Sequence, residues 1–148
     1  MGLMQSLRTS TSALLAQRLR MDLIANNVAN MNTTRTDEGG PYRRQAAVFR
    51  EQGREVPFRD FLGHATGAGS GQGGVEVGRI SVDASPPRRV HDPSHPDADA
   101  DGYVLLPNID VITEMTDLVG ANRAYEASVT VLNATKALAL SALRIGRG

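Results

Sequence analysis

The chain has 148 residues, the length of one ordinary domain. Its formal net charge is zero and it has no cysteine, which excludes a general electrostatic attraction to nucleic acid, structural disulfides and thiol catalysis. Hydrophobic residues make up 41% of the chain, but with three Phe, three Tyr and no Trp we expect a thin, aliphatic core.

Residues 1–32 are predicted to form a first, N-terminal helix. Four of its apolar residues recur at every seventh position, a spacing that places them on one face of a helix. They are Leu7, Leu14, Met21 and Val28. The stripe is narrow and polar residues interrupt it, so the helix would be marginal without a partner.

The Asn-rich stretch ANNVANMNTT, residues 25–34, is expected to end this helix, because asparagine favours helix ends and left-handed backbone positions. Arg8, Arg18 and Arg20 interrupt the apolar sequence before it, so we expect no cleaved secretory signal. No stretch of the chain approaches the ~18–20 consecutive apolar residues of a membrane span. Direct membrane insertion is therefore not expected.

Residues 33–107 are predicted to form a β-rich middle segment. Its strand candidates, each bounded by Gly, Pro or Asp, are Tyr42–Glu51, Val75–Asp83 and Tyr103–Leu106. A Gly-rich stretch at residues 63–74 is predicted to be a flexible loop. It contains a G-x-G-x-x-G pattern, but a dinucleotide site needs a strand before that pattern and a helix after it, whereas here a strand pattern follows.

The sequence HPDADADGYVLLPN, which begins at His95, resembles the opening of a calcium-binding loop, because Asp97, Asp99 and Asp101 alternate before a glycine. Such a loop needs a bidentate carboxylate at its twelfth position, which here is Asn108. Prolines just before the stretch also disfavour the flanking helix that the motif requires. We interpret the stretch as a solvated acidic turn, with Asp-Gly as a hairpin signal. A small calcium- or other metal-binding module that uses His95 and the three aspartates remains the alternative.

Residues 108–148 are predicted to form a second, C-terminal helix. Asn108 follows a proline and is expected to be the N-cap. Leu118, Tyr125 and Leu132 recur at every seventh position and would share one helix face.

No constellation of catalytic residues is evident. The three histidines are His64, His91 and His95. A proline between His91 and His95 disfavours the helix that would direct both side chains at one metal ion. No nucleophile motif is present, and the carboxylates cluster in one turn instead of converging from separate elements. We therefore expect a protein that is not an enzyme and needs no cofactor.

Two long stretches resemble a known family. SALLAQRLRMDLIANNVANMNTTRT, residues 12–36, is similar to the N-terminal signature of the bacterial flagellar axial family, the rod and hook proteins. SPPRRVHDPSHPDADADGYVLLPN, residues 85–108, together with the helix after it, narrows the resemblance to the rod proteins. The similarity covers nearly the whole chain except the Gly-rich stretch, and it assigns the acidic turn to a family signature instead of a metal loop.

The resemblance implies an α+β fold in which the terminal helices pair as a coiled coil and the small β-rich segment lies between them. It further implies a structural subunit that the flagellar type III export apparatus exports unfolded, without a cleaved signal peptide. Such a subunit joins other rod and basal-body proteins in a periplasmic helical assembly.

Contacts between helix pairs of successive subunits would be heterologous, and these propagate as a tube instead of closing as a dimer. We expect the subunit interface to use the apolar residues of both helix stripes. These residues are Leu7, Leu14, Met21, Val28, Leu118, Tyr125 and Leu132.

Overall fold

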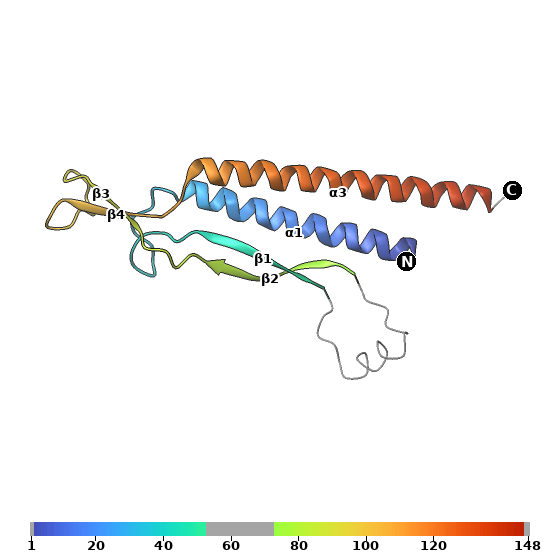
Figure 1. Ribbon diagram of the computed structural model, residues 1–148, viewed down its shortest axis with the longest axis horizontal. Helices are drawn as coiled ribbons and strands as arrows, with labels where there is room; N and C mark the ends of the chain where they lie inside the picture. The colour runs from blue at the N-terminus through green and yellow to red at the C-terminus, as the bar shows by residue number, and fades with distance from the viewer. Residues whose placement is uncertain (1, 53–72, 147–148) are drawn as a thin grey trace, which may run out of the picture. The chain divides into compact units, whose positions relative to one another are not determined.

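The computed structural model describes residues 2–52 and 73–146 (Figure 1). The elements in chain order are α1 (Leu3–Ala29), β1 (Gln45–Glu51), β2 (Val75–Val82), β3 (Arg88–His91), β4 (Tyr103–Leu106) and α3 (Val111–Ile145). Two long terminal helices with a small β region between them confirm the α+β class. Most of the predicted Gly-rich loop, residues 63–72 of it, lies outside the described residues.

The end of α1 falls within the Asn-rich stretch, as predicted. The Asn30 side-chain amide donates a 2.9 Å hydrogen bond to the carbonyl oxygen of Asn26. The backbone N–H of Thr33 then donates to the carbonyl oxygen of Asn30 at 3.1 Å, which turns the chain away from the helix axis. These bonds satisfy groups that the helix end leaves without intrahelical partners.

The start of α3 corrects the predicted N-cap. Asp110, not Asn108, caps the helix: one of its carboxylate oxygens accepts the N–H of Ile112 at 3.2 Å and the other accepts the hydroxyl of Thr113 at 2.6 Å. The hydrogen bond from Thr113, with that from Ile112, holds the pKa of Asp110 below its usual value. The prediction of Asn108 as the N-cap was wrong. Pro107 and Ile109 on either side of it are buried, and the helix begins only at Val111.

The middle segment forms two separate two-stranded sheets, β1 with β2 and β3 with β4. β1, β2 and β4 were predicted, although β1 begins three residues later than expected, at Gln45. β3 was missed because RRVH shows little apolar alternation. It pairs antiparallel with β4, with Arg88 opposite Leu106 and His91 opposite Tyr103.

The described chain divides into two compact units. The first contains the described parts of Met1–Arg18, Phe49–Gly78 and Arg123–Gly148, and the second contains Leu19–Val48 and Arg79–Asn122.

Most of the buried side chains belong to the second unit. Besides Pro107, the buried apolar residues in the described parts of the chain are Ala16, Leu23, Ile24, Val104, Ile109 and Ala121. None is aromatic, which confirms the expected thin, aliphatic core.

Candidate assembly interface

Asn27 is the centre of a buried polar junction in the second unit. Its side chain is fully buried. The side-chain oxygen accepts the Gln45 N–H at 2.9 Å and the Tyr42 hydroxyl at 3.2 Å. The side-chain nitrogen donates to the Gln45 carbonyl at 2.8 Å and to the Glu114 carboxylate at 3.0 Å. Both donors and both acceptor positions of the amide are therefore used, so its burial leaves no polar group unsatisfied.

Glu114 brings a carboxylate from α3 into the same junction. It is 1% exposed, and its other oxygen accepts the Arg44 Nε–H at 2.5 Å. Asp117, one turn further along α3, lies 3.4 Å from a guanidinium nitrogen of Arg44 and 3.4 Å from one of Arg20. A buried charge is tolerated only when it is paired and hydrogen-bonded, and Glu114 meets both conditions. Because Asn27 and Arg20 lie near the end of α1 and their partners near the start of α3, the two helices run antiparallel in this unit.

Tyr42 completes the junction. Burial raises the pKa of its phenol, and the negative charge of Glu114 raises this pKa further. The hydroxyl therefore stays protonated at neutral pH and can donate to Asn27.

The residues predicted on the C-terminal helix lie on the row of α3 that contains the buried Glu114 and Ala121. Leu118 is 36% exposed, and Tyr125 and Leu132 are half-buried. The spacing of alternately three and four residues along this row is that of a coiled-coil seam.

The predicted residues of α1 are all half-buried. Leu7 and Leu14 belong to the first unit, and Met21 and Val28 to the second. The buried apolar residues of this helix are Ala16, Leu23 and Ile24. Ala16 and Leu23 each follow a stripe residue by two positions, which places them on the opposite side of a helix with about 3.6 residues per turn. The predicted stripe is therefore not the face of α1 that is buried most deeply.

Polar residues of α1 contact β2 in the first unit. Thr9 donates a 2.7 Å hydrogen bond to the Gly73 carbonyl, and the Ser12 hydroxyl accepts the Val75 N–H at 3.0 Å. Thr9 and Ser12 therefore have hydrogen-bond partners at the start of β2 and just before it.

An exposed apolar stripe on α3 was not predicted as interface. Ile112, Met115 and Val119 are 76%, 55% and 52% exposed. With about 3.6 residues per turn, they lie on the side of the helix opposite Glu114 and Ala121. Their spacing of three and four residues is the sequence signal that could have identified them.

A further exposed set lies on the part of α3 that belongs to the first unit. Val131, Leu138 and Ile145 are exposed and recur at every seventh position. Single exposed apolar residues are ordinary, but a repeated row along a helix is typical of an association surface.

The acidic turn between β3 and β4 is held by hydrogen bonds within the second unit. One Asp99 oxygen accepts the N–H groups of Asp101 at 3.0 Å and Tyr103 at 2.8 Å, and the other lies 3.3 Å from Arg89. The backbone bond from Tyr103 is the main cause that lowers the pKa of Asp99. Gly102 has φ = 77°, the left-handed conformation that an Asp-Gly turn requires.

These contacts support the interpretation as a turn. Asp97 makes a contact that Asp99 does not share: its carboxylate accepts a hydrogen bond from the Thr34 hydroxyl. Within residues 2–52 and 73–146, no group of three or more His, Asp or Glu side chains is placed to hold a metal ion.

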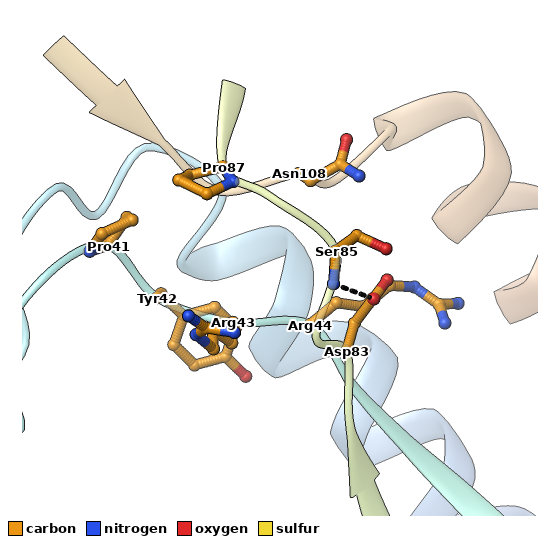
Figure 2. A pocket seen from close by; sticks show the side chains of 8 residues that line it. All are labelled: Pro41, Tyr42, Arg43, Arg44, Asp83, Ser85, Pro87 and Asn108. Atoms are coloured by element: carbon orange, nitrogen blue, oxygen red, sulfur yellow. Dashed lines mark hydrogen bonds between the residues drawn. The ribbon is translucent and has the colours of Figure 1, made fainter. Parts of the chain in front are cut away.

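A small surface hollow lies in the second unit. It is lined by Pro41, Tyr42, Arg43, Arg44, Asp83, Ser85, Pro87 and Asn108 (Figure 2). The side chains of Arg43 and Arg44 point in different directions, and the Asp83 carboxylate accepts the Ser85 N–H at 2.8 Å (Figure 2). Since Arg44 is already paired with Glu114 and Asp117, the polar lining is largely occupied by internal contacts.

In the part of the chain that the structure describes, neither helix is long and apolar enough to cross a membrane.

Comparison with known proteins matches both ends of the chain. The family model for "Flagella basal body rod protein" matches residues 7–35, which include most of α1. The model for "Flagellar basal body rod FlgEFG protein C-terminal" matches residues 100–145, which include β4 and α3.

Similarity to individual relatives extends over nearly the full length. The chain is 44% identical to the flagellar basal-body rod protein FlgC of Borreliella burgdorferi over 153 residues, covering 100% of both chains. It is 46% identical to FlgC of Bacillus subtilis, covering 96% of this chain and 97% of the relative. It is 34% identical to FlgC of Salmonella typhimurium, covering 99% and 100%. The chain therefore belongs to the family of the flagellar basal-body rod protein FlgC.

Proposed function

We propose that this chain is a structural subunit of the proximal rod of the flagellar basal body. It polymerises through its terminal helices and forms part of the periplasm-spanning drive shaft for flagellum-dependent motility. The observation that carries this proposal is the identity of 33–46% to proteins named FlgC over nearly the whole chain. The apolar rows left exposed on α3 support it, because an assembly subunit needs surfaces that its neighbours cover.

The subunit interface uses the half-buried stripe of α1 and the seam row of α3. Its residues are Leu7, Leu14, Met21, Val28, Leu118, Tyr125 and Leu132. Each keeps some exposed surface in the subunit, so each has apolar area to lose when a neighbour packs against it. The exposed stripe of Ile112, Met115 and Val119 adds a further surface to this interface.

The partners are other rod and basal-body proteins and further copies of this chain. The chain reaches the periplasm through the flagellar type III export apparatus, without a cleaved signal peptide. It does not insert into the membrane and does not bind nucleic acid. Its role is mechanical and not catalytic. The dense hydrogen bonding around Asn27 and Glu114 suits a part that transmits torque, because satisfied polar networks make a structure rigid.

A pair of neighbouring leucines tests this assignment. Leu14 lies on the predicted stripe and is half-buried, whereas Leu15 lies on the exposed face. In a deletion strain of the source bacterium, Leu14→Asp should be exported but should fail to assemble a rod, because a packed interface would have to desolvate the new charge. Leu15→Asp is the matched control and should restore swimming.

Electron microscopy of isolated basal bodies measures rod assembly, and a swimming assay measures motility. Normal rods with Leu14→Asp present would show that this face is not buried in the assembly. Intact basal bodies in the deletion strain would contradict the proposed function itself.

A further inference from the structure

The surface hollow contains an arginine that has no partner within the described chain (Figure 2). Arg43 is exposed, and its guanidinium makes no hydrogen bond or ion pair with any part of residues 2–52 and 73–146. Its neighbour Arg44, by contrast, is paired with Glu114 and Asp117. A guanidinium presents its N–H donors in a fixed fork that fits a carboxylate, so Arg43 is available to bind one from outside the subunit.

The size and lining of the hollow suit a single carboxylate. Its volume of about 40 Å³ would hold about three water-sized groups. Pro41 and Pro87 form apolar parts of the wall, and the exposed Asn108 amide, which has no hydrogen-bond partner in the described part of the chain, adds a further donor. The negative charge of Asp83, which also lines the hollow, disfavours freely diffusing anions. A carboxylate held in place by a neighbouring protein can approach Arg43 without approaching Asp83.

The acidic turn between β3 and β4 presents such a carboxylate. Asp97 and Asp99 are both bonded to groups of the same chain. The Asp101 carboxylate is exposed and has no hydrogen bond or ion pair among the described residues. The Asp101 N–H is bonded to Asp99, and Gly102 beside it has the left-handed conformation, so the backbone that carries this carboxylate is fixed.

We propose that the Asp101 carboxylate of one copy of the chain binds Arg43 in the hollow of the next copy in the rod. The two groups belong to different parts of one subunit surface, so the contact is heterologous and can repeat along an open helical assembly. Their opposite charges give the contact its specificity. Both residues lie outside the two helices, so this contact is separate from the helix stripes. The inference rests on the proposed function and concerns the chain in its assembled state.

Exchange of the two charges in a deletion strain of the source bacterium tests the inference. Arg43→Asp and Asp101→Arg should each lower the number of rods in isolated basal bodies by at least about tenfold, because each places like charges at the contact. The double variant restores opposite charges and should return the number of rods to within about threefold of the wild type. Asp37→Arg changes an exposed aspartate without a described partner in another turn, and it should not restore rods to Arg43→Asp.

The absence of cysteine allows the contact to be measured directly. One form of the chain carries Arg43→Cys and a second form, produced in the same cells, carries Asp101→Cys. An ion pair between long side chains holds the two backbones further apart than a disulfide spans, so the isolated basal bodies are treated with a short bismaleimide crosslinker. A crosslinked dimer should appear on a denaturing gel, and it should be absent when Asp37→Cys replaces Asp101→Cys.

A normal number of rods with Arg43→Asp, or no crosslinked dimer in assembled basal bodies, would overturn the inference. Loss of rods in Arg43→Asp that Asp101→Arg does not restore would also overturn it, because the hollow would then bind a different partner. These outcomes leave the proposed function intact, since that function is contradicted by intact basal bodies in the deletion strain itself.

Discussion

The hydroxyl of Thr34 donates a 2.6 Å hydrogen bond to a carboxylate oxygen of Asp97. A residue just beyond α1 is thereby joined to the acidic turn between β3 and β4, at a sequence separation of 63. The turn is part of the packed second unit, and only one of its alternating aspartates makes this contact.

Asp97→Ala should therefore destabilise the chain by up to about 1 kcal/mol, the usual net value of one hydrogen bond. Asp101→Ala, two residues away in the same exposed turn, should remain within about 0.5 kcal/mol of the wild type. Urea unfolding measures both. Thr34→Val combined with Asp97→Ala should cost no more than Asp97→Ala alone, and additive losses would show that the hydrogen bond does not contribute.

Calcium should not bind to the acidic turn with micromolar affinity. The Asp99 oxygens contact two backbone N–H groups and Arg89, and the Asp97 carboxylate contacts Thr34. These two carboxylates therefore have different partners within the chain. Calorimetric titration of the purified chain with Ca²⁺ checks this. Micromolar binding that is lost when Asp97, Asp99 and Asp101 are all replaced with Asn would restore the metal-binding alternative.

Two glycine substitutions should have opposite effects. Gly102→Ala should destabilise by about 1–3 kcal/mol because its φ of 77° suits few other residues. The added Cβ would also lie 3.0 Å from Pro93 Cγ. Gly120→Ala lies inside α3 with open space around the new Cβ and should stabilise by up to about 1 kcal/mol. Thermal unfolding of the two variants against the wild type provides the comparison, and a neutral Gly102→Ala would contradict the described turn.

The N-cap of α3 predicts a dependence on acid. The pKa of Asp110 is lowered in the folded chain, so its contribution to stability is complete above its unfolded pKa, about 4, and is lost as the pH falls through the folded value. Asp110→Ala should reduce the helical circular dichroism signal and the unfolding midpoint at neutral pH, and the difference from the wild type should shrink in acid. Asn108→Ala should have little effect, and a larger loss than for Asp110→Ala would favour the cap expected from the sequence.

Tyr42 should make the unfolding of the chain sensitive to alkali. Because its pKa is raised in the folded chain, its contribution to stability is complete below the unfolded pKa, about 10, and is lost as the pH rises through the folded value. Tyr42→Phe should cost about 1 kcal/mol at neutral pH, through the lost hydrogen bond to Asn27, and should weaken the alkaline loss. Tyr103→Phe is the exposed control. The measurement is urea unfolding between neutral pH and pH 11, and equal alkaline sensitivity of the wild type and Tyr42→Phe would contradict the role of this phenol.

Features with a local cause could be predicted from the sequence. The periodicity of apolar residues identified α1 and α3, and the Asn-rich stretch identified the end of α1. The Asp-Gly pair identified the turn at Gly102, whose positive φ follows from the absence of a Cβ. Helix periodicity, helix ends and tight turns depend on residues within about four positions of each other, so a single sequence contains their signals.

The tertiary structure alone decided which polar residues are buried. From the sequence, Asn27 is expected to help end a helix and Glu114 to be an ordinary acidic residue in a first helical turn. In the structure, they are hydrogen-bonded to each other in the junction, although 87 positions of sequence separate them. The same distant packing buries Pro107 and Ile109 and so moves the N-cap from Asn108 to Asp110. The free energy of burying a charge depends on partners that the fold brings from elsewhere in the chain, and no local pattern of residues encodes those partners.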